Sequence, residues 1–124
     1  MVLIIGGAYQ GKLDYVLENH PGKSVYQCDT KITEIDFTSD IVNALHILIL
    51  AQIRAGIDPL IYIKENLHKL DRKIVICDDI SCGIVPVDPE MRQWREASGR
   101  CLTLLSKNAD EVVRMFCGIG SRIK

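Results

Sequence analysis

Short aliphatic runs alternate with longer segments of helical spacing along this chain. The runs are rich in Val and Ile and have the length of buried strands. They lie at residues 2–5, 25–28, 73–77 and 111–117, with a candidate further strand at 32–37 and a last short strand at 122–124.

Two of the intervening segments are predicted helices because of the residues that bound them. Residues 12–19 are followed by His20, Pro21 and Gly22, a combination that stops a helix. Thr38 or Ser39 can cap a second helix, which runs to residue 55 and ends before a glycine. Its stretch 41–53 is apolar almost all round. We therefore expect it to be deeply buried or to lie in a subunit interface, and we favour a homo-oligomer.

Asp58-Pro59 and Asp88-Pro89 each place a capping aspartate before a proline, and predict helices through about residues 70 and 108. Strands that alternate with helices indicate an α/β fold, with a mostly parallel sheet and helices on both faces. The glycine turn at 118–120 suits an antiparallel hairpin at the C-terminal end instead. A chain of 124 residues has room for one domain, which we place at 1–124.

Composition and charge exclude several classes of partner. Fifteen basic and sixteen acidic residues give a net charge of −1, so nothing steers the chain toward nucleic acid or an anionic membrane. The apolar stretch 41–53 is too short to span a bilayer, and no basic leader precedes the first strand.

Cysteine spacing points to a reducing compartment. The five cysteines contain no C-x-x-C pair, which argues against a zinc site or a redox pair and favours the cytoplasm. We expect Cys77 and Cys117, which lie inside apolar runs, to be small core residues.

The candidate chemistry centres on the segment G-G-A-Y-Q-G-K, which follows the first strand and opens the first helix. This is the context of the phosphate loop G-x-x-x-x-G-K-[ST], in which backbone amides, a helix N-terminus and a lysine surround phosphate oxygens. Leu13 stands where Ser or Thr would give a hydroxyl to Mg²⁺. The alternative is an ordinary tight turn with an exposed lysine. The residues expected to hold a nucleotide are Gly6, Gly7, Ala8, Tyr9, Gln10, Gly11, Lys12 and Leu13.

Carboxylates at strand ends complete the candidate site. Asp36 ends the candidate strand 32–37, and Asp78 and Asp79 follow the strand 73–77. Because the carboxyl ends of parallel strands face the ligand crevice, these groups could hold Mg²⁺ or orient a substrate hydroxyl, with Asp79 in a catalytic role beside Lys12. The alternative, that strand-end aspartates cap the next turn, is equally open.

Further motifs in the second half resemble one family. They are G-I-V-P at 83–86, R-x-x-R at 92–95, G-R at 99–100, A-D-E-V at 109–112 and G-I-G-S-R-I-K at 118–124. Together with the loop, they resemble the bifunctional adenosylcobinamide kinase/adenosylcobinamide-phosphate guanylyltransferase family of cobalamin biosynthesis.

The resemblance implies a P-loop fold, ATP or GTP, a corrinoid acceptor and an oligomer. It also implies that Gly83, Arg92, Arg95 and Asp36 serve phosphate or substrate. Arg92 and Arg95 are three apart and share a helix face, where arginines could grip phosphate or simply be solvated. Trp94, between them, is interpreted as a packing residue.

The chain also departs from the family pattern. Family members are longer and carry a His-His segment followed by Arg-Pro, in which one histidine takes the guanylyl group. Here His20, His46 and His68 lie in unrelated contexts, and His46 is interpreted as a satisfied core or interface residue. Leu102 stands where the family usually has an asparagine. We therefore expect the guanylyltransferase step to be absent.

Two functions stay open from the sequence. The first is a kinase that phosphorylates a corrinoid side-chain hydroxyl from a nucleoside triphosphate, with Mg²⁺ coupling weakened by Leu13. The second is a catalytically inactive family member that binds a nucleotide or acts as an interaction or regulatory subunit.

Overall fold

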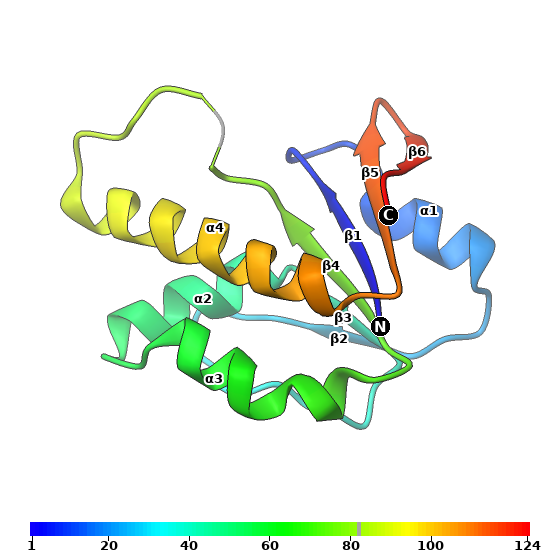
Figure 1. Cartoon of the computed structure of the whole chain (residues 1–124), viewed down its shortest axis with the longest axis horizontal. Coiled ribbons are helices and arrows are strands. Elements are labelled where there is room, and N and C mark those ends of the chain that lie inside the picture. The colour runs from blue at the N-terminus through cyan, green and yellow to red at the C-terminus, as the bar shows by residue number, and fades with distance from the viewer. Residues whose placement is uncertain (82) are drawn as a thin grey trace.

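A single sheet of six strands lies at the centre of the computed structural model, which describes residues 1–81 and 83–124 (Figure 1). The strands are β1 (Val2–Gly6), β2 (Val25–Gln27), β3 (Ile41–Asn43), β4 (Ile74–Asp78), β5 (Glu111–Phe116) and β6 (Ile119–Arg122). The helices are α1 (Lys12–Asn19), α2 (Leu45–Arg54), α3 (Pro59–Asn66), the short 3-10 helix η1 (Leu67–Leu70) and α4 (Pro89–Asn108).

The sheet topology confirms the predicted fold class. The strand order is β2-β3-β4-β1-β5-β6, and every neighbouring pair is parallel except β5 and β6. Those two form an antiparallel hairpin, in which Phe116 faces Ile119. The described part of the chain contains no helix long and apolar enough to cross a membrane.

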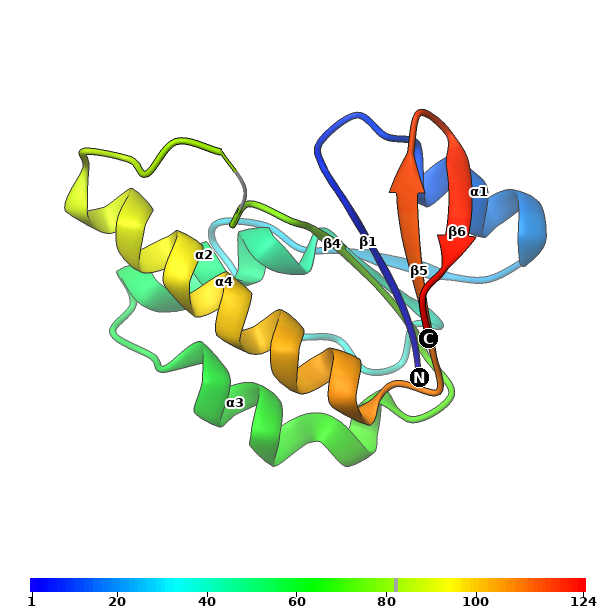
Figure 2. The ribbon, with the colours of Figure 1, turned by 45° about the horizontal axis from the view of Figure 1, so that its top comes forward.

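Helices cover both faces of the sheet because successive strand residues point to opposite sides. Leu3 and Val75 belong to the core beneath α2, α3 and α4, whereas their neighbours Ile4 and Ile76 belong to a second core beneath α1. Figure 2 shows α1 on one side of the sheet and α2, α3 and α4 on the other. Both cores are buried within one chain.

The two Asp-Pro signals mark true helix starts. The Asp58 side chain accepts a hydrogen bond from the Leu60 amide at 2.9 Å, and Asp88 accepts one from the Glu90 amide at 2.8 Å. Each aspartate satisfies an amide that has no acceptor within its helix, while the proline occupies a position that needs no donor.

The segment 32–43 differs from the sequence prediction. Residues 32–37 form no strand; they are a loop whose Ile35 packs into the core and whose Ile35 amide donates to the Tyr62 hydroxyl at 2.8 Å. The predicted helix from Thr38 or Ser39 is also wrong at its start. Ile41–Asn43 form β3 between β2 and β4, and α2 begins only at Leu45.

The apolar run 41–53 therefore joins a strand to a helix. Ala44, with a φ of 61°, separates the two elements, and the side chains of Ile41 and Val42 enter opposite cores. Because α2 is covered by α3, α4 and β4 of the same chain, its apolar surface needs no partner subunit. The apolar surface of this helix therefore no longer supports a homo-oligomer, which stays a prediction.

The cysteines fit the expectation only in part. Cys77 is fully buried, as predicted, and Cys28 and Cys101 are buried as well. Cys117 is exposed, contrary to the prediction, because β5 ends at Phe116 and Cys117 begins the hairpin turn with a φ of 51°. These four thiols are free, and Cys82 lies outside the described residues.

Two glycines offer a test of this packing. A Cβ on Gly6, whose φ is 155°, would lie 2.7 Å from the Met115 carbonyl oxygen of the neighbouring strand. Gly6→Ala should therefore lower the free energy of unfolding by about 1–3 kcal/mol, the usual cost of overpacking. Gly99 lies within α4, where a Cβ would come no closer than 3.9 Å to Ser81. Gly99→Ala should raise the free energy of unfolding by about 0.5–1 kcal/mol. Urea denaturation measures both, and equal effects would contradict the packing described.

Candidate functional site

The loop between β1 and α1 is held in place by the turn that follows the neighbouring strand β5. The Gln10 side-chain oxygen accepts a hydrogen bond from the Cys117 amide, and the Gln10 carbonyl accepts one from the Gly118 amide at 3.1 Å. Gly11 takes the left-handed conformation, with a φ of 80°, just before α1 begins. The loop is thus fixed against the β5–β6 turn, and the first turn of α1 lies at the end of the sheet.

A hollow of about 470 Å³ opens beside this loop. It lies at the carboxyl ends of β3 and β4, where ligands of open α/β sheets bind. The Tyr9 side chain is fully exposed and does not fill it. The lining residues are Tyr9, Gln10, Gly11, Lys12, Leu13, Asp14, Asn43, Ala44, His46, Ile76 and Asp78.

Lys12 is buried at this hollow, which is not what an ordinary turn with an exposed lysine would give. Only 7% of the residue is exposed. Its Nζ donates to the Gly7 carbonyl oxygen at 2.6 Å and lies 2.6 Å from Oδ1 of Asp78. A buried ammonium needs such oxygen partners, since without them its desolvation would not be offset. The lysine therefore places a positive charge under the loop.

Backbone donors add to that positive potential. Tyr15 is the first residue of the helix to donate to a preceding carbonyl, that of Gly11, at 3.0 Å. The amides before it, at Lys12, Leu13 and Asp14, belong to the first turn and have no acceptor within the helix. These amides and the helix dipole favour a bound anion, although the exposed Asp14 carboxylate supplies part of that negative charge already.

His46 belongs to the same cluster. It is a buried residue with a hydrogen-bond partner, as the sequence indicated, but the sequence did not place it at this site. Its Nδ1 accepts a hydrogen bond from the Asp78 amide at 3.1 Å, and its Nε2 lies 3.4 Å from Oδ2 of Asp78. Burial lowers the pKa of His46 from its usual value, and this outweighs the Asp78 carboxylate, which raises it. Because Nδ1 accepts the bond from the Asp78 amide, the proton of a neutral imidazole lies on Nε2, the nitrogen nearer the carboxylate.

Trp94 fixes the position of His46 from the other side. The indole Nε1 donates to the His46 carbonyl oxygen at 2.7 Å, and the two rings are stacked with their centroids 6.2 Å apart. The predicted packing role of Trp94 agrees with this contact. An apolar context had suggested a core histidine. The sequence predicted one continuous helix where the structure has β3 followed by α2. The break between these two elements brings His46 to the end of the sheet.

The adjacent carboxylates Asp78 and Asp79 have different surroundings. Asp78 faces the hollow and pairs with Lys12. The Asp79 amide donates to the Gly6 carbonyl at 2.8 Å, and its carboxylate accepts from the amide and hydroxyl of Ser81. Asp79 thus caps the turn after β4, as the alternative interpretation had it. It also lines a second hollow with Gly6 and Gly7.

The structure does not bring the other predicted residues to the first hollow. Asp36 is exposed and accepts from the amide and hydroxyl of Thr38, contacts that hold its pKa below the usual value. Arg95 donates to the Ile84 carbonyl at 2.9 Å and so supports the loop before α4, in which Gly83 is exposed with a φ of 92°. Arg92 is exposed on α4.

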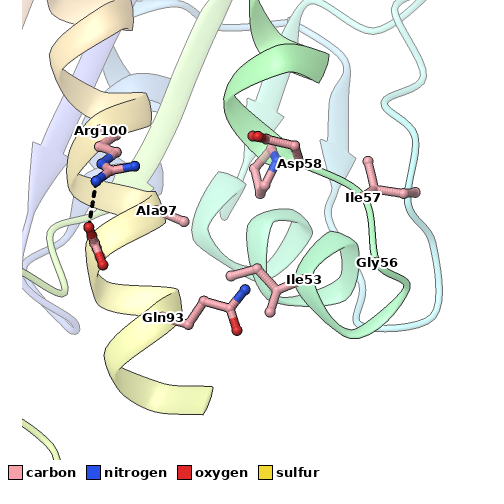
Figure 3. Close-up of a pocket in the computed structure, with 9 residues that line it drawn as sticks. Ile53, Gly56, Ile57, Asp58, Gln93, Ala97 and Arg100 are labelled. Carbon is pink, nitrogen blue, oxygen red and sulfur yellow. Dashed lines mark hydrogen bonds and ion pairs between the residues drawn. The ribbon is translucent and has the colours of Figure 1, made fainter. Parts of the chain in front are cut away.

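Another hollow, of about 330 Å³, lies between the α2–α3 turn and α4 (Figure 3). Arg100 lines it but is paired with Glu96 at 2.6 Å. Asp58 faces the same hollow while capping α3. Because this hollow has two carboxylates and its one arginine is already paired, it is a poorer site for an anion than the loop is.

Leu13 and Leu102 stand where the loop pattern has Ser or Thr and where the family usually has an asparagine. Leu102 is buried in the core beneath α4. Leu13 is partly buried, packs against the core beneath α1 and supplies no oxygen to the hollow. Within the described residues, no group of three or more His, Cys, Asp or Glu side chains could hold a metal ion.

Comparison with known proteins establishes the family. The model of the cobinamide kinase/cobinamide phosphate guanyltransferase family matches residues 35–123, most of the chain. The chain therefore belongs to this family, whose work lies in cobalamin biosynthesis and involves nucleotides and corrinoids. No curated protein matches the chain. The match begins after the loop, so the case for the loop rests on its own geometry.

The contacts of His46 lead to a prediction about stability. His46→Ala leaves the partly buried Asp78 amide without its acceptor, and should lower the free energy of unfolding by about 1–3 kcal/mol. In His46→Asn, the side-chain oxygen can accept from that amide, so part of the loss should be recovered. Chemical denaturation measures both variants. Equal losses would mean that the Asp78 amide does not depend on His46.

Proposed function

We propose that this chain binds the phosphates of a nucleoside triphosphate at residues 6–13 and transfers the terminal phosphoryl group to a hydroxyl of a corrinoid side chain. The observation that carries the proposal is the buried Lys12 ammonium beneath the loop, 2.6 Å from Asp78. Family membership supports the reaction class, since the family is named for cobinamide kinases.

Binding would exchange the partners of Lys12. In the structure its ammonium contacts the Gly7 carbonyl and Asp78, and phosphate oxygens would take one or both places. Asp78 would then keep the contacts with His46, whose ring holds both its amide and its carboxylate. The lysine can move without leaving a buried carboxylate unpartnered.

The reaction itself needs positioning and charge neutralisation. The acceptor oxygen forms a bond to the γ-phosphorus, and the bond from that phosphorus to the β,γ-bridging oxygen breaks. The nucleoside diphosphate leaves with the electron pair. In this proposal Asp79, which follows β4, receives the hydroxyl proton, and Lys12 neutralises charge on the phosphates.

Magnesium fits this site only together with the nucleotide. Mg²⁺ is usually held by one or two carboxylates, with substrate phosphates and water completing its shell. Asp78 is the carboxylate best placed to contribute, while Leu13 contributes nothing. The ion would supply further neutralisation of phosphate charge.

The guanylyl transfer of the family is a step that we propose is absent. His46 has both ring nitrogens directed to Asp78, and His68 lies with Met1 at the opposite end of β1 from the loop. His20 caps the C-terminal end of α1. Of the three, only His46 lines the hollow of Lys12, and its contacts are made to Asp78, so we propose that no histidine accepts a nucleotide here.

A second candidate function is an inactive, nucleotide-binding subunit. It is favoured by Leu13, which removes the magnesium hydroxyl, and by the Ser81 contacts that tie Asp79 into a turn. Phosphate transfer from ATP or GTP to cobinamide separates the two functions. Product formation supports the kinase, whereas nucleotide binding without product supports the subunit.

Lys12→Ala tests the nucleotide site. The variant should weaken triphosphate binding by about 1.5–3 kcal/mol, the usual contribution of a hydrogen bond to a charged group. Isothermal titration calorimetry with ATP and GTP measures the change. Lys23→Ala, which alters an exposed lysine outside the hollow, is the matched control and should bind as the parent does. Unchanged affinity in a folded Lys12→Ala protein would place the nucleotide elsewhere.

Leu13→Ser tests the magnesium coupling. A hydroxyl at this position restores the ligand that the loop pattern expects. The ratio of triphosphate affinities with and without Mg²⁺ should therefore increase in the variant. Leu17→Ser, at an exposed leucine one turn further along α1, controls for the loss of an apolar side chain. An unchanged ratio would mean that the ion does not reach residue 13.

A further inference from the structure

Three of the four tyrosines have a role in the fold, and the fourth, Tyr9, has none. The Tyr26 hydroxyl donates to a backbone carbonyl oxygen at 3.0 Å, and the Tyr62 hydroxyl accepts from a backbone amide at 2.8 Å. Tyr15 is half-buried and packs against the core beneath α1. The Tyr9 side chain, by contrast, is fully exposed, and among the described residues its hydroxyl has no hydrogen-bond partner.

A single exposed ring needs no explanation by itself, but the position of Tyr9 does. The residue lines the nucleotide hollow and lies three positions before Lys12. Its φ of 59° is in the left-handed region, which a tyrosine rarely adopts because its Cβ crowds the following carbonyl. The loop is fixed on both sides of it, since the Gly7 carbonyl accepts from Lys12 and Gln10 is bound to the β5–β6 turn. The ring is therefore held at the mouth of the hollow.

The chemistry of the loop shows what this side chain adds. Tyr9 carries the only side-chain hydroxyl within residues 6–13. A hydroxyl that donates to a charged phosphate oxygen makes a strong hydrogen bond. The face of an aromatic ring carries negative charge and is a poor surface for an anion. Contact with phosphate would therefore be made through the hydroxyl, and the ring would remain on the solvent side of the phosphates.

The side chain is free to make this contact. Exposed side chains change rotamer rapidly, and Tyr9 can turn toward the hollow without displacing a packed neighbour. The hollow is open beneath it, because the ring does not fill it. A cover is useful at such a site, since water competes with the acceptor for the phosphoryl group unless it is kept out.

We propose that Tyr9 is the cover of the nucleotide site. Its hydroxyl donates to an oxygen of the bound triphosphate, and its ring lies over the phosphates and keeps water from them. This inference rests on the proposed function. It adds a side chain that reaches the phosphates from the solvent side to the backbone amides and Lys12, which surround them from the loop. The ligand chemistry recognised is a polyphosphate chain, with or without a base.

Calorimetric titration of the full chain with ATP, GTP and inorganic tripolyphosphate tests the hydroxyl. Tyr9→Phe removes only the hydroxyl from a fully exposed side chain, so the fold should be retained. All three affinities should fall about tenfold, near the lower end of the usual contribution of a hydrogen bond to a charged group. Tyr26→Phe removes a hydroxyl whose partner, the Glu34 carbonyl, lies outside the hollow, and should bind as the parent does.

Fluorine NMR of the chain labelled with 3-fluorotyrosine tests the ring. Tyr9→Phe identifies the Tyr9 signal by its loss. Without ligand, this signal should shift strongly between H₂O and D₂O, because the ring is in contact with solvent. Saturation with tripolyphosphate should reduce that shift by at least half, while the signal of Tyr26 should keep its own.

Each outcome decides the proposal. Equal affinities in the parent and Tyr9→Phe, or a Tyr9 signal that stays exposed with tripolyphosphate bound, overturn the cover and leave the nucleotide site standing. A loss confined to ATP and GTP places the ring against the nucleoside and also overturns it. A parent that binds none of the three ligands overturns both proposals. If Lys12→Ala leaves the affinities unchanged while Tyr9→Phe lowers them, the nucleotide site as proposed fails and the Tyr9 contact stands.

Discussion

The contact between Lys12 and Asp78 joins the two parts of the chain that make the site. Lys12 opens α1 and Asp78 ends β4, so their 2.6 Å separation holds the loop over the carboxyl ends of two neighbouring strands. β1 and β4 are paired along their whole length, with Gly6 facing Asp78. The sheet register therefore places the carboxylate beneath the loop, and the ion pair follows from that register.

Stability alone does not account for this pair. The Lys12 side chain is 7% exposed and that of Asp78 is 20% exposed, so both charges lose part of their hydration. A buried ion pair often stabilises a fold no better than apolar residues of the same size, whereas the loss of one partner is costly. The pair makes physical sense where one charge is to be offered to a ligand. His46, held by Trp94, provides the carboxylate with a second partner that remains when the lysine turns away.

The sequence predicted most strands and helices because their signals are local. An aspartate followed by proline fixes the start of α3 and α4, and a glycine-rich turn fixes the loop before α1. The segment 32–43 could not be predicted in this way. Its β3 has only three residues, and it is a strand because β2 and β4 flank it on both sides. A run of apolar residues that continues into α2 carries no local sign of the break at Ala44.

The reach of local signals also explains which residues of the candidate site could be predicted from the sequence. Lys12 and Asp78 lie at fixed offsets from predicted strands, so a motif and a strand end were enough to place them. His46 depends on where α2 starts, which is decided by packing between segments distant in the sequence. Asp36 was assigned to the site because it ended a predicted strand that does not form, and Arg92 and Arg95 because of the resemblance and their shared helix face. Their side chains face turns, loops or solvent rather than Lys12.

Backbone strain gives an independent argument for the proposed site. Four non-glycine residues in the described part of the chain have a positive φ: Tyr9, Ala44, Arg72 and Cys117. Tyr9 and Ala44 line the hollow beside the loop, and the Cys117 amide donates to Gln10 of the loop. Such conformations cost on the order of 1–3 kcal/mol each and persist where the surrounding structure enforces them, often at functional sites. Two of the four therefore lie at the hollow beside Lys12, which supports the proposal that this hollow receives a ligand.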